Sequence, residues 1–283
     1  MIFLLLSILL SVLTVCFFKL FERYNVHTLQ AIIFNYATCI LIGNTLSDDV
    51  IILQPFWEYP WFGYALLLGF MFISVFYSIG LTSQKMGVSV SMVAAKLSVV
   101  IPVGVACLVH GEVMGGFKIG GILLSLVAVF LISRKSDEDV NRQGKWLWLL
   151  PVYVFLGSGV IDATLKHMQQ EFIPPGNAGD MVSTVFLIAF IIGILVLLTR
   201  KETLQLKSIG WGIALGIPNF FCMFFLVKTL ENFDATFIFP INNIAIVVCS
   251  TIVSLLFFQE KMSVANRIGF ALAICSILII SFA

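Results

Sequence analysis

The chain has 283 residues, of which 60% are hydrophobic and only 11% are charged. Soluble globular domains average about 25% charged residues, so this composition excludes an ordinary soluble fold. The net charge of +1 excludes a broadly basic surface, and with it nucleic acid as an expected partner.

The first 18 residues, MIFLLLSILLSVLTVCFF, form an uncharged and mainly apolar stretch. A secretory signal peptide needs a positively charged start and a small-residue cleavage site, and this stretch has neither. We therefore expect a retained first transmembrane helix.

About 20 apolar residues cross the hydrocarbon core of a bilayer as a helix, and the chain contains ten stretches of roughly that length. Helices are expected rather than a β-barrel, because the stretches are continuously apolar and do not alternate. The predicted spans are 1–18, 28–46, 61–83, 88–110, 114–133, 146–167, 178–198, 207–229, 234–257 and 264–282.

The longest charged stretch, SRKSDEDVNRQGK, lies midway along the chain and contains the predicted cytoplasmic linker, 134–145. It separates a first five-helix repeat, 1–133, from a second, 146–283. Because five is an odd number of spans, the two repeats have opposite orientations, which is a common design of secondary transporters. The fold class is therefore an all-α integral membrane protein with ten transmembrane helices in two inverted repeats.

The last span of each half follows a similar motif. A shift of 148 residues places HGEVMGGFKIGG (110–121) on FQEKMSVANRIG (258–269), so that Glu112 meets Glu260. We expect each glutamate to cap the span that follows it, and a gate contact is the alternative. The GxxxG motifs at Gly116 and Gly212 predict close helix packing.

Lys and Arg residues are distributed unequally between the two sides of the membrane. The odd-numbered loops carry twelve and the opposite side carries three, which places the odd-numbered loops in the cytoplasm. We expect a multi-pass protein of the bacterial inner (plasma) membrane. The twelve are Lys19, Arg23, Lys85, Arg134, Lys135, Arg142, Lys145, Arg200, Lys201, Lys207, Lys261 and Arg267; the three are Lys118, Lys166 and Lys228.

The layout of five plus five spans, the proline in the fourth span, and the two glutamate-bearing motifs resemble the drug/metabolite transporter superfamily in its ten-helix EamA-type form. The resemblance covers essentially the full length. It implies a basket of helices in which spans 3, 4, 8 and 9 surround a central cavity. The charge distribution departs from the pattern, because members of that family are often taken to have cytoplasmic termini.

Lys96, in the apolar stretch VAAKLSVVIP, is the least expected residue of the chain. A lysine near the bilayer centre costs about 2.5–3.5 kcal/mol on insertion scales, so it marks a functional site by default. Lys96 lies on a polar stripe of span 4 and Asn243 on one of span 9, and they approach the midplane from opposite sides. Interhelical hydrogen bonding is the alternative reading of such stripes.

Five further residues join Lys96 in the predicted substrate site. Asn242, Asn243 and Asn219 supply neutral hydrogen bonds, and Tyr77 is a wall candidate. Asp162 is the one acidic residue well inside a span. Its axial offset of about 13 Å predicts that Lys96 has no permanent carboxylate partner.

Three prolines within spans, Pro102, Pro218 and Pro240, are predicted helix breaks or gating points. A proline lacks the N–H that would bond to the preceding turn, and the freed carbonyl needs another partner or a cavity.

The leading interpretation is a secondary transporter of a small organic metabolite, anionic or zwitterionic, such as an amino acid or organic acid. Two alternatives stay open: proton-coupled export of cationic drugs, for which Asp162 is the candidate residue, and a non-transporting membrane scaffold. Coupling to protons or other ions, and a monomer or a homodimer, are also left open. We expect no enzyme, because no catalytic motif occurs, and no metal or cofactor.

Overall fold

The structure is a computed structural model, and it describes residues 1–46, 56–58, 60–102, 104, 115–133, 146–172, 178–200, 203–230, 233 and 235–282. Within these ranges the chain is helical and contains no strand. The elements are α1 (Ile2–Arg23), α2 (Thr28–Leu46), the short 3-10 helix η2 (Phe56–Glu58), α3 (Phe62–Met86), α4 (Val88–Leu97), α6 (Gly116–Ser133), α8 (Leu149–Glu171), α9 (Ala178–Arg200), α10 (Leu206–Leu230), α11 (Ala235–Leu256) and α12 (Val264–Phe282).

Ten α-helices are therefore present in the described part of the chain, one for each predicted span, and the predicted all-α membrane fold is confirmed. Five are long and apolar enough to cross a membrane by length and composition alone. These stretches are Ile2–Arg23, Thr28–Leu46, Phe62–Met86, Val182–Arg200 and Leu206–Leu226; the shorter apolar ones are Val88–Pro102, Ile119–Leu131, Leu149–Leu165, Ile241–Leu256 and Val264–Ile280.

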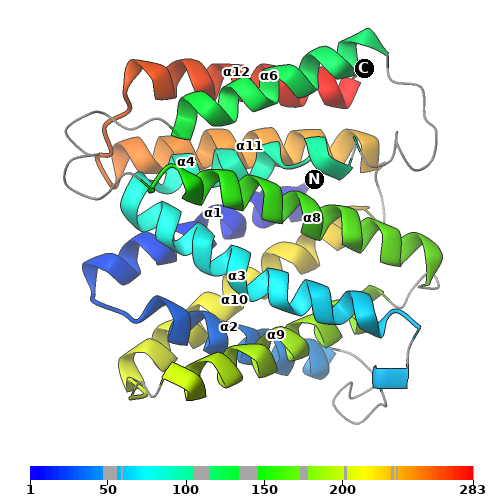
Figure 1. The fold of residues 1–283 in the computed structure, drawn as a ribbon, viewed down its shortest axis with the longest axis vertical. Helices are drawn as coiled ribbons and strands as arrows, with labels where there is room; N and C mark the ends of the chain where they lie inside the picture. Colours follow the sequence, from blue (N-terminus) through cyan, green and yellow to red (C-terminus); the bar gives the residue numbers. More distant parts are fainter. Residues whose placement is uncertain are drawn as a thin grey trace.

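The helices lie across the short dimension of Figure 1 and stack along its long axis. The last helices of the two halves, α6 and α12, pack together at one end of the stack, and α2 packs with α9 and α10 at the other. The remaining helices lie between them. Both chain termini are in the right half of the view, as expected for an even number of helices.

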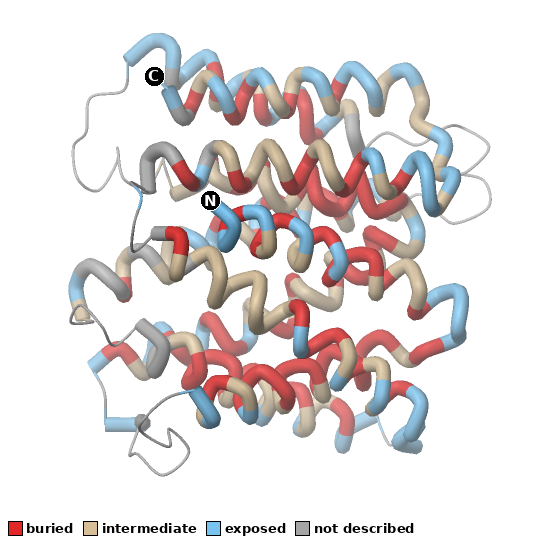
Figure 2. The backbone as a smooth tube through the Cα atoms, turned by 180° about the vertical axis from the view of Figure 1, so that it is seen from behind, coloured by how far each residue is buried: buried red, intermediate tan, exposed pale blue. Residues whose placement is uncertain are grey.

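Burial is concentrated in the middle of the stack and around α2, as Figure 2 shows. The largest apolar cluster is built on Phe18, Phe21, Ile32, Ile33 and Tyr36, each at most 1% exposed. The outward faces carry large exposed apolar side chains instead, which suits contact with hydrocarbon. Examples are Phe117, Phe130, Leu195 and Leu198.

α4 ends at Leu97, whereas the sequence predicted one continuous helix over 88–110. Ser98 and Val99 form a turn before helical backbone resumes. Pro102 explains this position, because it has no N–H for the carbonyl of Ser98 and its ring would clash with that carbonyl. Ile101 N donates to Ser98 O instead, at 2.9 Å. Residues 103 and 105–110 lie outside the described ranges.

The other two prolines do not interrupt their helices. Pro218 lies inside α10, and α11 runs through Pro240. A break at these two positions is therefore not what the structure shows, and only Pro102 accompanies one.

One of the two GxxxG motifs makes the predicted close contact. A Cβ atom on Gly212 would lie 2.5 Å from the carbonyl oxygen of Ala31, and one on Gly216 would lie 2.5 Å from Thr38 Cβ, so α10 packs tightly on α2. The close contact predicted at Gly116 and Gly120 is not seen, because a Cβ on either would meet none of the described residues within 4 Å.

Glu260, in the turn between α11 and α12, caps a helix of the other half of the chain. Val88 N, at the start of α4, donates to Glu260 Oε2 at 3.0 Å, and Ser254 Oγ also donates to that oxygen. The prediction that Glu260 caps the following helix is therefore wrong. Ser263 occupies that position, since its Oγ accepts from Asn266 N at 3.1 Å. Glu112 lies outside the described residues.

Gly87 makes this contact possible, because its φ of +111° is accessible mainly to glycine and a Cβ would lie 2.4 Å from Glu260 Oε2. We expect Gly87→Ala to destabilise the protein by about 1–3 kcal/mol. Thermal unfolding in detergent measures the effect. Gly63→Ala is the matched control, since a Cβ on Gly63 meets nothing within 4 Å. Equal melting temperatures for the two variants would contradict the expectation.

Candidate functional site

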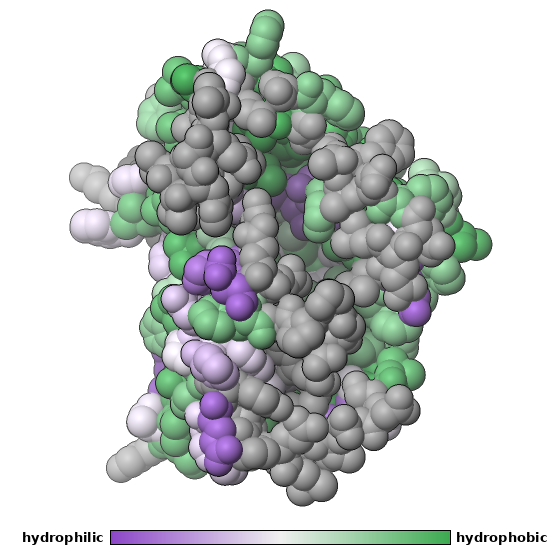
Figure 3. Space-filling model, turned by 90° about the vertical axis from the view of Figure 1, so that its right-hand side faces the viewer, coloured by the Kyte–Doolittle hydropathy of each residue, from purple (hydrophilic) through white to green (hydrophobic). Residues whose placement is uncertain are grey.

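A cavity of about 200 Å³ lies inside the helix bundle, and seven helices contribute to its wall: α1, α2, α3, α4, α9, α10 and α11. The expected wall helices, which correspond to α3, α4, α10 and α11, are all among them. The lining residues are Ser7, Ser11, Tyr36, Phe72, Phe76, Lys96, Phe186, Asn219, Cys222, Met223, Leu226 and Asn242. Figure 3 looks at the end of the bundle where η2 lies and shows a recessed hydrophilic spot between apolar side chains.

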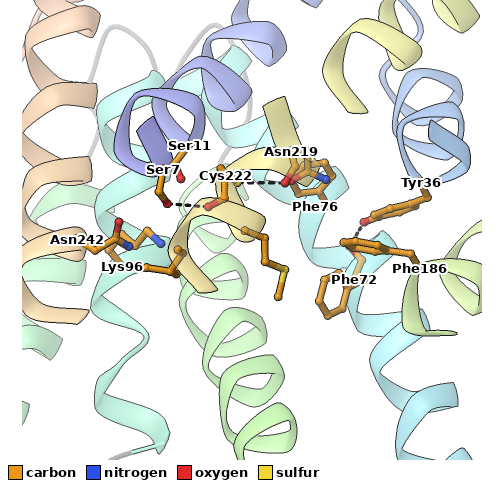
Figure 4. A pocket seen from close by; sticks show the side chains of 12 residues that line it. Ser7, Ser11, Tyr36, Phe72, Phe76, Lys96, Phe186, Asn219, Cys222 and Asn242 are labelled. Atoms are coloured by element: carbon orange, nitrogen blue, oxygen red, sulfur yellow. Dashed lines mark hydrogen bonds between the residues drawn. The ribbon is translucent and has the colours of Figure 1, made fainter. Parts of the chain in front are cut away.

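The polar lining residues lie mainly at one end of the cavity, as Figure 4 shows. Lys96 and Asn242 project there from α4 and α11, which pack against each other, and Ser7 and Ser11 approach from α1. Ser7 Oγ donates to the carbonyl oxygen of Cys222 at 2.7 Å, so this hydroxyl proton is already used.

Lys96 is half-buried, and among the described residues no carboxylate lies within 4.0 Å of its ammonium group. Asn242 is 3% exposed, and its Oδ1 atom is buried without a hydrogen-bond partner. Among the described residues, the polar end of the cavity thus presents a cation with no carboxylate at ion-pair distance and an acceptor without a hydrogen bond.

The opposite end of the cavity is aromatic (Figure 4). The rings of Tyr36 and Phe186 stack at a centroid distance of 5.6 Å, and Phe72 meets Phe186 edge-on at 5.7 Å. The Tyr36 hydroxyl donates to the carbonyl oxygen of Phe72 at 2.9 Å. Because that hydroxyl is used within the wall, the end offers ring surface rather than a free polar group.

Asn219 connects the cavity to a polar cluster between α10 and α2. Its Nδ2 donates to Asn35 Oδ1 at 3.1 Å and lies 3.7 Å from Cys39 Sγ. Asn35 is fully buried, and its Nδ2 has no hydrogen-bond partner. This cluster fixes the orientation of the Asn219 amide.

The structure brings three of the predicted site residues, Lys96, Asn242 and Asn219, onto one cavity. Asn243 is half-buried on α11 and Tyr77 packs against the apolar cluster of Phe18, and neither belongs to the lining. In both cases the preceding residue lines the cavity. Consecutive side chains on a helix point about 100° apart, so one of each pair faces elsewhere.

Asp162 lies closer to Lys96 along the bundle than the predicted offset of about 13 Å. Ser98, two residues after Lys96, donates from Oγ to Asp162 Oδ2 at 3.4 Å, and two residues correspond to about 3 Å of helix rise. The predicted offset is wrong, and part of the error arises because α8 extends to Glu171, which moves the helix centre toward Asp162. Asp162 is exposed and interacts electrostatically with Lys96, but it does not line the cavity.

The predicted wall lacks α1, α2 and α9, which also contribute lining residues. For α1 a signal existed, since Ser7, Ser11 and Thr14 follow a helical spacing on one face of an otherwise apolar span. For the aromatic residues there was none. The chain has 27 Phe residues, and phenylalanines that face lipid have the same spacing as those that face a cavity.

The ten helices and their apolar outward faces define a multi-pass membrane protein. Residues 147–282 match the EamA-like transporter family, whose members are transporters of small molecules rather than enzymes. This match supports the predicted resemblance over the second half of the chain.

Two full-length similarities accompany this match. An uncharacterized protein of Haemophilus influenzae is 29% identical over 287 residues, which cover 96% of this chain and 94% of that protein. A solved crystal structure covers 98% of this chain and 94% of its own at 15% identity and a TM-score of 0.58, which shows a shared fold.

Proposed function

We propose that the protein is a secondary transporter that moves a small organic anion or zwitterion, such as an amino acid or organic acid, by alternating access. The observation that carries the proposal is the Lys96 ammonium, which faces an internal cavity with Asn242 and Asn219 and has no carboxylate within ion-pair distance among the described residues. An unpaired cation at membrane depth is costly, and an anionic substrate would supply its partner.

Helix packing supports two inverted repeats, 1–133 and 146–283, joined by the linker 134–145. α10 packs on α1 and α2, and α3 packs on α8 and α9, as expected when each helix is exchanged for its counterpart. The symmetry is not exact in the described ranges: α1 packs closely on α3 whereas α8 and α10 hardly touch, and α3 packs closely on α4 whereas α10 and α11 touch only slightly. A carrier in one of two states has such an asymmetry, and the other state would exchange these contacts.

For the orientation, we propose that the odd-numbered loops are cytoplasmic and that the membrane is the bacterial inner membrane. The basic residues at the corresponding end of the described helices support this under the positive-inside rule. They are Lys19, Arg23, Lys85, Arg200, Lys207, Lys261 and Arg267.

Proton-coupled export of a cationic drug is the second candidate, and the exposed Asp162 carboxylate beside Ser98 favours it. It is the weaker candidate because the charge that lines the cavity is the cation of Lys96.

The test is uptake of radiolabelled amino acids and organic acids into proteoliposomes by the wild type and two Lys96 variants. We expect Lys96→Ala to lower uptake of the transported anion about 10- to 100-fold, since a charge-assisted hydrogen bond is lost. Lys96→Arg keeps the charge in a different geometry and should retain part of the activity. Lys85→Ala, at an exposed residue of α3, is the control. Full uptake by both Lys96 variants would refute the proposal.

A further inference from the structure

The buried acceptor at the polar end of the cavity defines a requirement on the ligand. Asn242 Oδ1 has no hydrogen-bond partner among the described residues, and Asn242 is 3% exposed. Nearly all buried polar atoms in proteins are hydrogen-bonded, so an exception on a cavity wall points to a missing donor. A ligand donor at this position would satisfy it.

Lys96 defines a second requirement at the same end. Its ammonium group has donors only, and no carboxylate of the described chain is within 4.0 Å. Lys96 and Asn242 lie together in Figure 4, so the two requirements apply to adjacent parts of one ligand. That ligand has an anionic group directly beside a hydrogen-bond donor.

The aromatic end defines the remainder of the ligand. Phe72, Phe186 and Tyr36 form its wall, and the only hydroxyl among them is bonded to a backbone carbonyl. A polar ligand group at this end would lose its hydrogen bonds to water without gaining new ones from these three side chains. This end therefore favours an apolar part of the ligand.

The size of the cavity fits such a molecule. Apolar cavities of about 150 Å³ bind benzene, and this cavity has about 200 Å³. The space suffices for one aromatic ring with a short polar head group.

We infer that the cavity takes an amphipathic anion: a carboxylate with a hydroxyl or amino donor on the adjacent carbon, attached to an apolar body about the size of a phenyl ring. The inference rests on the proposed transport function and narrows its substrate class. Lys96 binds the carboxylate, Asn242 Oδ1 accepts from the adjacent donor, and the rings of Phe72, Phe186 and Tyr36 enclose the body.

The test is direct binding to the purified full-length protein in detergent, by calorimetry, with probes that each lack one feature. Phenyllactate and phenylalanine carry all three features. 3-Phenylpropionate lacks the donor, lactate lacks the apolar body, and phenethyl alcohol lacks the anion. We expect phenyllactate or phenylalanine to bind at least about tenfold more tightly than lactate, from burial of the ring. We expect phenyllactate or phenylalanine to bind about fivefold more tightly than 3-phenylpropionate, because each can form one additional hydrogen bond.

Asn242→Leu tests the assignment of the donor contact. It should reduce the preference for phenyllactate over 3-phenylpropionate to less than about twofold, because leucine has no acceptor. Asn243→Leu is the matched control, since Asn243 is the neighbouring residue and does not line the cavity. It should leave the preference unchanged.

The outcomes separate the two levels of the proposal. If lactate binds as tightly as phenyllactate and Lys96→Ala abolishes both, the apolar body is refuted and the proposed anion transport stands. If 3-phenylpropionate equals phenyllactate in the wild type, the donor is refuted. If none of the anions binds in a Lys96-dependent way, the proposed function fails and the inference fails with it. The ligand series needs no variant, so it remains decisive if Asn242→Leu does not fold.

Discussion

Replacing Gly216 by leucine should lower the thermal stability of the protein more than any single exposed substitution. A Cβ at this position would lie 2.5 Å from Thr38 Cβ and 2.9 Å from the carbonyl oxygen of Asn35. Side-chain rotation cannot relieve the second contact, because Asn35 O is backbone, so α2 and α10 must separate. Overpacking of this kind costs about 3 kcal/mol, which corresponds to a melting temperature roughly 10 °C lower.

Gly210→Leu, on the same helix, is the control. Gly210 is exposed and a Cβ there meets nothing within 4 Å, so the better helix propensity of leucine should leave stability equal or slightly higher. Both variants are compared by thermal unfolding in the same detergent. An unchanged melting temperature for Gly216→Leu would mean that α2 and α10 do not pack as the structure has them.

The number and order of the helices could be predicted because lipid leaves the backbone few alternatives. A segment of about 20 apolar residues must form a helix that satisfies its own hydrogen bonds. The predicted ends of 28–46 and 114–133 accordingly fall within two residues of α2 and α6. The first span ends later than predicted, at Arg23, and the fourth departs most, since a proline effect at Ser98 ends the regular helix within a mainly apolar stretch.

The candidate site could be predicted only to the nearest residue or two. Hydropathy finds that Asn242 and Asn243 lie in a span, but which of them faces the cavity depends on the rotation of α11, and neighbouring helices determine that rotation. The same holds for Phe76 and Tyr77. The position of Asp162 beside Ser98 depends on where α8 ends. The hydropathy of a stretch does not predict the residue at which its helix ends.

Contacts between the halves were the least predictable feature. Glu260 was recognised as a helix cap from the motif before the last span, but the helix that it caps is α4, distant in the sequence. A carboxylate stabilises any helix N-terminus that tertiary packing brings to it. The local sequence around Glu260 therefore does not predict which helix it caps.

This cap gives the second large effect that we expect: Glu260→Gln should lower the free energy of unfolding by about 2 kcal/mol. Glu260 accepts from Val88 N at 3.0 Å and lies 3.5 Å from Lys19 Nζ, and its side chain is only 16% exposed. The substitution takes one of two carboxylate partners from Lys19, whose side chain is 23% exposed, and losing one partner of a buried charge pair costs about 2–5 kcal/mol. The lower end applies because glutamine can still accept one bond. Thermal unfolding in detergent provides the measurement.

Glu22→Gln is the matched control, because it breaks an ion pair with the same lysine. Glu22 Oε2 lies 3.2 Å from Lys19 Nζ, closer than Glu260, but the Glu22 side chain is 52% exposed. An exposed pair contributes about 0–1 kcal/mol and is screened by salt. If the distance to Lys19 alone determined the loss of stability, Glu22→Gln would destabilise the protein more. If burial and the contact with Val88 N determine it, Glu260→Gln will destabilise the protein more, and the loss will persist in high salt. Equal losses in the two variants would show that Glu260 does not hold α1 and α4 together.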